Sequence, residues 1–329
     1  MKKLIKLSII LALSLNLSAC KLSQPNIGVT VYPVQYLVER IAQNKVTTTL
    51  LSEGKTITRA QMISDYEDKL DSLDVLFVFG SLEPYLSVYN ETLQSEGVPM
   101  VDLTSSASVY AFQRYETSYI SSTRVTLESS YYLGSAFNQV DMYQNDPYLW
   151  LDPITMISIA GSIKDWLVTY YPEEKASFEA NYEALALELA RMDADYQELW
   201  KQQISFVSVT PSFGNWQKAF GINVYPLILS KYGVLPTETQ LAIIEERIKQ
   251  DEVQYIVHEP NLTEDMEALY QRVKDDLKLQ SVEMHNIAFL TDTDVTNNKN
   301  YITLMWENLS ILEGMLPITY AQEETTTTD

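Results

Sequence analysis

The segment between residues 172 and 203 places the strongest constraint on the fold. Pro172 is followed by apolar side chains at alternating spacings of four and three residues, without an intervening glycine or proline: Phe178, Tyr182, Leu185, Leu189, Met192, Tyr196 and Leu199. This spacing places all of them on one face of an α-helix. A helix of about 30 residues is roughly 45 Å long, comparable to the width of a domain. We therefore expect one long helix that joins two halves of the molecule.

Both halves show strand-like apolar runs that alternate with helix-like segments. The first half contains the runs 27–32, 46–51, 75–79 and 98–103, and the second contains 204–209, 222–227, 255–257 and 281–284. Such alternation is typical of βα units around a parallel sheet. The sequence therefore predicts an α/β protein with two similar lobes. We place the N-terminal lobe at 21–171, the linker helix at 172–203 and the C-terminal lobe at 204–317.

Two segments depart from this alternation. Residues 104–145 are rich in serine, threonine and tyrosine, and we expect an elaborated loop or a small antiparallel addition. Its tyrosines either line a ligand cleft or, as is commoner, are exposed on edge strands. Residues 318–329 are rich in threonine and acidic side chains and few are apolar, so we expect a disordered tail.

The first 20 residues have the pattern of a bacterial secretory leader. Three lysines within residues 1–6 precede a short apolar run that ends at Leu17-Ser18-Ala19-Cys20. The run is shorter than the roughly 20 residues that span a bilayer. Its end resembles a lipobox, which predicts lipidation of Cys20 and attachment to the outer face of the cell membrane. Since the chain has no second cysteine, no intramolecular disulfide is expected.

The charge of the chain excludes one class of partner. The formal net charge is −21 at pH 7, and loss of the leader lysines makes it more negative. Such a surface repels phosphate groups, so nucleic acid binding is not expected. Nor does the sequence contain a P-loop, a G-x-S-x-G turn or an H-E-x-x-H motif, so we expect no enzymatic activity.

Four ordered blocks carry a family resemblance. They are 146–153 (DPYLWLDP), 213–221 (FGNWQKAFG), 255–261 (YIVHEPN) and 301–309 (YITLMWENL). In this order they resemble the D-P-H-x-W-L-D-P, F-G-Y-F-x-x-x-Y-G, Y-I-F-x-E-P-N and Y-x-x-x-M-x-x-N-L motifs of the cluster A-I metal-binding proteins, the zinc and manganese receptors of ABC importers. The resemblance implies a monomeric receptor that works with an ABC permease and ATPase.

The resemblance also implies where a ligand would bind. In the family, a zinc or manganese ion lies between the lobes, held by histidines and a carboxylate. The aligned positions here are Thr58, Tyr148, Thr210 and Asp292, of which only Asp292 keeps the family's residue type. Zinc needs about four imidazole, thiolate or carboxylate ligands, and threonine hydroxyls are poor substitutes. We therefore expect the usual metal site to be largely lost.

Three hypotheses remain for the cleft. In the first, the site takes another solute or an oxygen-preferring cation through the four aligned positions, with Arg59 nearby. In the second, a displaced zinc or manganese site is formed by His258, Glu259 and His285 together with Asp292. In the third, transport is lost and the protein is a surface adhesin that binds a partner. We rank capture of another solute first, loss of binding with an adhesin role second, and the displaced metal site third.

Overall fold

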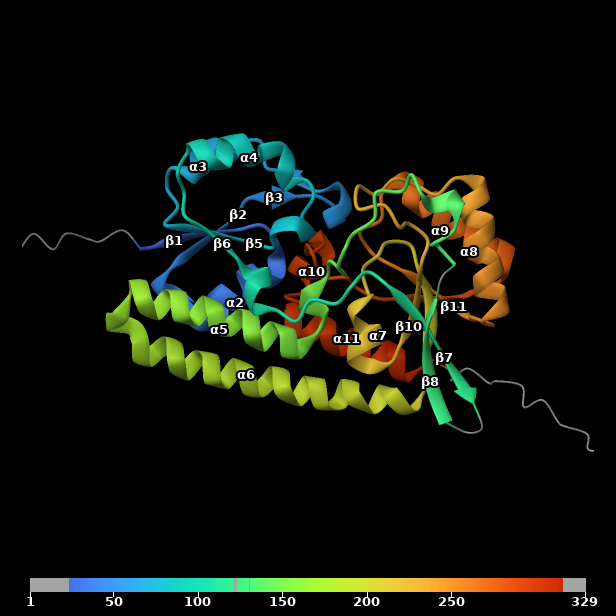
Figure 1. Ribbon diagram of the computed structural model, residues 1–329. Helices are drawn as coiled ribbons and strands as arrows, with labels where there is room; N and C mark the ends of the chain where they lie inside the picture. Colours follow the sequence, from blue (N-terminus) through green and yellow to red (C-terminus); the bar gives the residue numbers. More distant parts are fainter. Residues whose placement is uncertain (1–23, 121–122, 130, 316–329) are drawn as a thin grey trace, which may run out of the picture.

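The computed structural model describes residues 24–120, 123–129 and 131–315 (Figure 1). The predicted leader with Cys20 and the predicted tail at 318–329 lie outside the described residues. Within the described ranges, no helix is long and apolar enough to cross a membrane.

Two four-stranded parallel sheets form the two halves of the fold. The first has the order β2-β1-β5-β6, formed by β1 (Asn26–Val29), β2 (Thr47–Leu50), β5 (Val75–Val78) and β6 (Met100–Asp102). The second has the order β10-β9-β11-β12, formed by β9 (Ser205–Ser208), β10 (Asn223–Pro226), β11 (Tyr255–His258) and β12 (Gln280–Glu283). In both sheets the first strand in sequence lies between the second and the third. The predicted pair of similar α/β lobes is therefore confirmed.

The helices and hairpins complete the two halves. The α-helices are α2 (Tyr32–Ala42), α3 (Tyr66–Leu70), α4 (Leu86–Ser95), α5 (Pro153–Tyr170), α6 (Lys175–Gln197), α7 (Asn215–Phe220), α8 (Glu238–Gln250), α9 (Glu264–Leu277), α10 (Asp292–Thr296) and α11 (Tyr301–Glu313). The antiparallel hairpins are β3 (Ser52–Glu53) with β4 (Gln61–Met62), and β7 (Arg114–Ile120) with β8 (Thr123–Ser129). Short 3-10 turns include η2 (Ile57–Arg59), η5 (Ser135–Phe137), η6 (Leu149–Leu151), η7 (Pro172–Glu174) and η8 (Glu198–Lys201).

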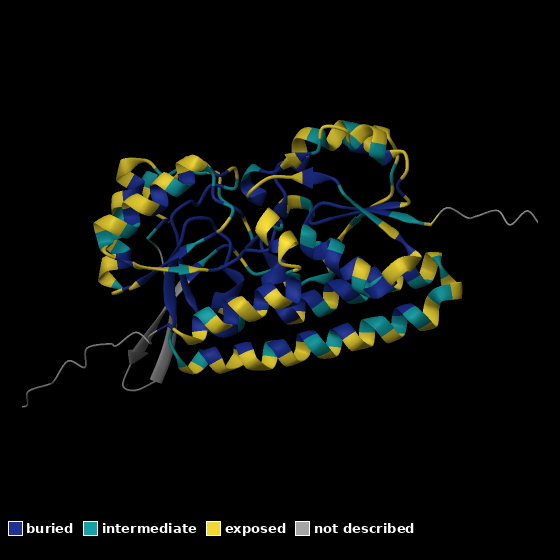
Figure 2. Ribbon diagram, turned by 180° about the vertical axis from the view of Figure 1, so that it is seen from behind, coloured by how far each residue is buried: buried dark blue, intermediate teal, exposed yellow. Residues whose placement is uncertain are grey.

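The long helix α6 is the predicted connection, and it runs beneath both halves (Figure 1). It has 23 residues, flanked by the 3-10 turns η7 and η8. It packs against α2 and α5 and, at its C-terminal end, against α7. All the apolar residues named for the predicted stripe are buried except Tyr182, which is partly buried, while the opposite face is exposed (Figure 2).

Local capping signals also produce the expected helix starts. The Asp152 carboxylate accepts hydrogen bonds from the backbone N–H groups of Ile154 and Thr155, and Pro153 occupies the first position of α5. Thr237 and Gln240 form a reciprocal capping box at the start of α8. These side chains satisfy backbone donors that would otherwise lack partners in the first turn.

The tyrosine-rich segment lies against the second sheet. The predicted antiparallel addition is the hairpin β7–β8, and β7 lies beside β10. The expectation of exposed tyrosines is wrong for Tyr132 and Tyr143, which are 3% and 5% exposed. Together with Phe112 and Phe137 they join a core cluster otherwise formed by residues of the second half. The apolar body of each ring is covered because the chain crosses to the second sheet before it returns to α5.

Tryptophan and tyrosine side chains tie the two halves together. Trp150 donates through Nε1 to the carbonyl of Asn286, and Trp216 donates to the carbonyl of Leu151, both at 2.8 Å. The hydroxyl of Tyr301 donates to the carbonyl of Trp150 at 2.6 Å. Three of the sequence blocks therefore meet in the buried region between the sheets.

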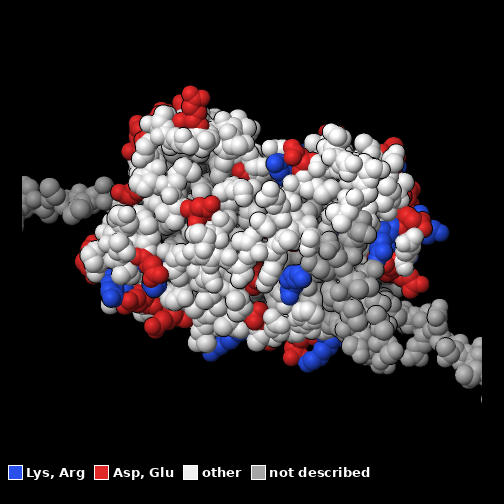
Figure 3. Space-filling view, viewed as in Figure 1, with Lys and Arg blue, Asp and Glu red and all other residues white. Residues whose placement is uncertain are grey.

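The surface agrees with the negative charge of the sequence. Acidic side chains are spread over the face shown in Figure 3, and basic ones are few and separate. Most of the exposed acidic groups lie on helices, where they point to solvent.

Candidate functional site

A buried carboxylate lies at the C-terminal end of β11, an inner strand of the second sheet. Glu259 directly follows β11 and has 0% exposure. It accepts hydrogen bonds from the backbone N–H of Thr210 at 3.1 Å, and from the Thr210 and Ser212 hydroxyls and the Asn286 amide, each at 2.8 Å to Oε2. An ionised carboxylate has about four lone-pair directions. Glu259 therefore has its acceptor capacity occupied by the protein itself.

Tyr148 occupies the space beside this carboxylate. The side chain is fully buried, and its hydroxyl makes no hydrogen bond of good geometry with the described residues. Burial raises the pKa of Tyr148 well above its usual range, and the charge of Glu259 adds to the rise. The pKa is lowered again, but only in part, by the Ser212 hydroxyl, the backbone of Ile57 and the Thr210 hydroxyl. Tyr148 is therefore a neutral phenol placed among the polar groups of both halves.

Thr58 approaches the same region from the first half. It lies in η2, is 5% exposed, and shares a hydrogen bond of 2.9 Å with the hydroxyl of Thr56. Its chain neighbour Ile57 provides the backbone group close to Tyr148. The structure thus brings together two of the four aligned positions, Tyr148 and Thr210, in a buried region between the two sheets, and Thr58 adjoins them through its chain neighbour Ile57. We call Thr58, Tyr148, Thr210, Ser212 and Glu259 the interlobe cluster.

The fourth aligned position lies elsewhere. Asp292 is exposed in the first turn of α10. The buried carboxylate of that turn belongs to Asp294, which is 5% exposed and accepts from His285 Nε2 at 3.0 Å and from the Thr291 backbone at 2.9 Å. The capping geometry of α10 turns Asp294 inward and leaves Asp292 on the outer side.

The two histidines are each held by other partners. His285 accepts the backbone N–H of Ile287 at Nδ1, 2.8 Å, so its Nε2 carries the proton donated to Asp294. His258 lies between Glu283 at Nδ1 and Glu267 at Nε2, both at 2.9 Å. Burial lowers the pKa of His258, but the hydrogen bonds to Glu267 and Glu283 outweigh it and leave the pKa raised.

These contacts argue against a displaced metal site. A histidine binds a metal through an unprotonated ring nitrogen, and all four ring nitrogens here have protein partners. Across the described ranges, no group of three or more histidine, cysteine, aspartate or glutamate side chains could hold a metal ion. The candidates His258, Glu259, His285 and Asp292 therefore do not gather around one point.

A second buried carboxylate repeats the arrangement in the first half. Glu83 follows β5, is 1% exposed, and accepts from the Thr30 hydroxyl at 3.0 Å, the Phe79 backbone at 2.6 Å and the Tyr85 hydroxyl at 2.9 Å. Burial raises the pKa of Glu83. In both halves, a glutamate after the third strand is bonded by a threonine that follows the first strand.

Sequence reasoning missed Glu83, Ser212, Asn286 and Asp294. The available signal was position, because polar residues just after buried parallel strands lie at the carboxyl edge of a sheet, where α/β folds bind ligands. That signal applies directly to Glu83 and Ser212. It could not have distinguished Asp294 from Asp292, since both belong to the same short turn.

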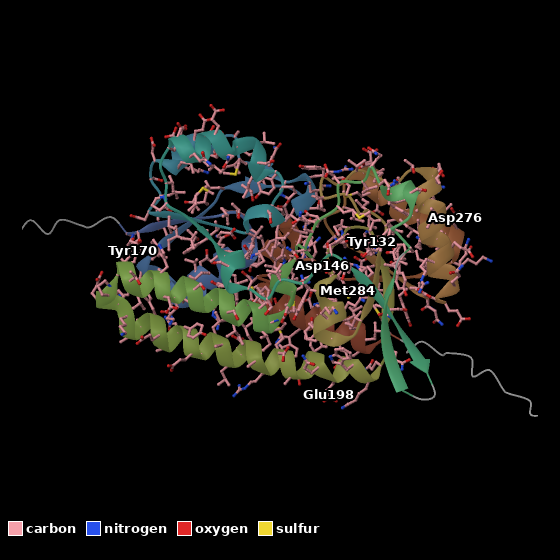
Figure 4. The ribbon with its side chains drawn as sticks, viewed as in Figure 1. Tyr132, Asp146, Tyr170, Glu198, Asp276 and Met284 are labelled. Atoms are coloured by element: carbon pink, nitrogen blue, oxygen red, sulfur yellow. The ribbon has the colours of Figure 1, made fainter. Side chains whose placement is uncertain are left out.

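A buried ion pair between Arg114 and Asp146 connects two of the four sequence blocks. Asp146 and Arg114 are 2% exposed and form two hydrogen bonds, at 2.7 and 3.1 Å. Gly214 lies directly against them: a Cβ atom there would be 2.0 Å from Asp146 Oδ1 and 2.5 Å from Arg114 Nη2. Figure 4 places Asp146 at the centre of the molecule, where the chain passes between the halves. The first aspartate of one block and the glycine of another are thus parts of one buried contact.

Comparison with known proteins places the chain in a family. The family model described as zinc-uptake complex component A, periplasmic, matches residues 27–314. The zinc-binding lipoprotein AdcA of Streptococcus pneumoniae is 28% identical over 173 residues, 52% of this chain and 34% of AdcA. The chain therefore spans about a third of the length of the curated relatives it matches.

Solved structures show the same fold. The periplasmic zinc-binding protein TroA from Treponema pallidum superposes with a TM-score of 0.70 at 15% identity, covering 90% of this chain and 100% of TroA. Zn(II)-bound AdcA from Streptococcus pneumoniae gives 0.67 at 21% identity, covering 90% of this chain and 59% of that structure. This is a family of substrate-binding receptors for ABC transport and not of enzymes, as the sequence predicted. The chain belongs to the family of periplasmic zinc-uptake component A proteins.

Proposed function

We propose that this protein is the solute receptor of an ABC importer, held at the outer face of the cell membrane by a lipid on Cys20. In this proposal it works as a monomer with a permease and an ATPase, and it captures its solute between the lobes at the interlobe cluster. The family membership and the two-lobed fold support the receptor role. The leader pattern, which precedes the described residues, supports the anchor.

We further propose that the usual transition-metal site is lost. The observation that carries this proposal is the chemistry of the interlobe cluster, which holds a neutral phenol, hydroxyls and one carboxylate with its acceptors occupied. Zinc binds imidazole nitrogen, thiolate sulfur or carboxylate oxygen in a tetrahedral array of about four ligands. The cluster offers no imidazole, and Asp292 lies on the surface instead.

The chemistry that remains favours a polar solute. Thr58, Tyr148, Thr210 and Ser212 present hydroxyl groups that both donate and accept hydrogen bonds. The Tyr148 hydroxyl has no well-formed hydrogen bond with the described residues, and a buried group of this kind gains free energy when a ligand supplies a partner. A solute that carries several hydrogen-bonding groups fits this set of side chains better than a transition metal does.

A thermal-unfolding screen tests the proposal. The protein is first stripped of metal with a chelator, and then titrated with zinc, manganese, ferrous and ferric iron, and a panel of polar organic solutes. A ligand at 100 times its dissociation constant adds about 2.7 kcal/mol to the free energy of unfolding, which a shifted midpoint reports clearly. We expect no shift with the metals and a shift with one class of organic solute.

The opposite result would reject the metal proposal while leaving the receptor role intact. A large zinc or manganese shift that Tyr148→Phe abolishes would place the metal at the interlobe cluster. One that His258→Ala abolishes instead would place it in a displaced site. If neither metals nor solutes shift the midpoint, the receptor role itself fails and a partner-binding surface protein becomes the better description.

A further inference from the structure

Arg59 crosses from the first half of the molecule to the second. It lies at the end of η2 and reaches Asp265, 206 positions later in the chain, through two hydrogen bonds of 2.7 and 2.8 Å. The two guanidinium nitrogens thus bind both carboxylate oxygens, the bidentate geometry that makes arginine–carboxylate pairs strong and directional. The Arg59 interaction lowers the pKa of Asp265 further than any other contact does.

Two further groups of the second half bind the same guanidinium. The carbonyl of Gly233 accepts from Nη2 at 2.6 Å and from Nε at 3.2 Å, and the Thr263 hydroxyl accepts from Nη1 at 3.1 Å. Nearby, Lys55 donates to the carbonyl of Leu262 at 3.3 Å. An exposed ion pair alone contributes little to stability, but here several partners converge on one partly buried side chain.

The shape of the opposing loop is fitted to Arg59. Gly233 has φ +67°, the left-handed region that glycine adopts without strain. A Cβ atom at this position would lie 3.0 Å from Arg59 Cγ and Nε and 3.1 Å from the Thr58 hydroxyl. The absence of a side chain at Gly233 therefore lets Arg59 and Thr58 approach the loop closely.

We infer that Arg59, Gly233 and Asp265 form a latch that holds the two lobes together across the side of the interlobe cluster where Thr58 lies. Thr58 belongs to the cluster and is the chain neighbour of Arg59, and its hydroxyl lies close to Gly233. The latch is therefore directly beside Thr58. Opening the lobes on this side requires these hydrogen bonds to break. The latch requires no particular solute and no transport activity.

Hydrogen exchange of the purified protein without any added ligand tests the latch. The variants are Arg59→Gln, Asp265→Asn and Gly233→Ala. The matched control is Arg272→Gln, which removes an equally short bidentate pair with Glu238 that joins two helices of the second half. We expect the latch variants to speed exchange about five-fold in segments 54–60 and 229–237, since local opening sets the exchange rate.

The outcomes separate a latch from a general loss of stability. The latch is supported if exchange accelerates in those two segments while β5 and β11 keep their wild-type rates, and if the control matches the wild type. Unchanged exchange in both segments for Arg59→Gln and Asp265→Asn would reject it. An equal acceleration throughout β5 and β11 would also reject it, because the contact would then stabilise the whole fold and not the lobe junction.

Discussion

The guanidinium of Arg114 and the carboxylate of Asp146 form an ion pair that is almost completely removed from solvent, with Nη2 2.7 Å from Oδ1. The pair joins the start of β7 to the segment that leads into η6. Burial raises the pKa of Asp146, although the attraction of Arg114 opposes the rise. Because both charges are buried, removal of one partner leaves the other without compensation.

Asp146→Ala should therefore destabilise the protein strongly. We expect a loss of about 3 to 5 kcal/mol in the free energy of unfolding, since a buried arginine would lose its counter-charge. Urea unfolding at neutral pH measures the change. The control is Glu238→Gln, which breaks an arginine pair on the surface and should leave the midpoint unchanged. Equal midpoints for the two variants would mean that the buried pair does not support the fold.

Gly214→Ala should also destabilise the protein, for a steric reason. The added methyl group would meet Asp146 and Arg114 well inside van der Waals contact. Overpacking of this kind costs about 1 to 3 kcal/mol. Gly134→Ala is the matched control, because no atom lies within 4 Å of its Cβ position and its φ is −74°. In thermal unfolding, only the Gly214 variant should melt earlier, and a wild-type midpoint would show that the neighbours can move aside.

Two residues of the interlobe cluster, Thr210 and Tyr148, should respond differently to loss of a hydroxyl. Thr210→Val removes a hydrogen bond to the buried Glu259 and should cost about 1 to 3 kcal/mol. Tyr148→Phe removes a hydroxyl without a well-formed hydrogen bond and should leave stability unchanged or slightly raised. Urea unfolding compares them directly. If Tyr148→Phe were as costly as Thr210→Val, the hydroxyl would have a structural partner and would be a poor candidate for solute contact.

The pH dependence of stability should contain a contribution from His258. Its pKa is raised in the folded protein by Glu267 and Glu283, against the effect of burial. The charged imidazole therefore stabilises the fold fully below its unfolded pKa of about 6.5, and this contribution is lost as the pH rises through the folded pKa. The pKa of Glu267 is lowered, so at acidic pH protonation of this carboxylate removes part of the effect.

We expect His258→Gln to weaken the protein most near pH 6 and progressively less as the pH rises above the folded pKa. Urea unfolding from pH 5 to pH 9 for both proteins gives the difference in free energy at each pH. A difference independent of pH would indicate that His258 acts through packing and not through its charge.

The sequence alone determined the architecture. The strands of the two parallel sheets and the longer helices follow from local patterns: buried runs such as that of β5, the stripe on α6, and the capping residues Asp152 and Thr237. The ordered blocks then indicated the family. These features are predictable because hydrophobic periodicity and helix capping depend on neighbours within about one or two helical turns.

Only the tertiary structure decided which polar groups meet. It selected Asp294 over Asp292 for burial, directed four hydrogen bonds onto Glu259, paired both histidines with carboxylates, and brought Arg59 to Asp265 across 206 positions. A buried polar group is stable only with partners at hydrogen-bond distance and suitable angles. Those partners come from loops far apart in the chain, and their positions depend on how the two sheets and α6 pack together.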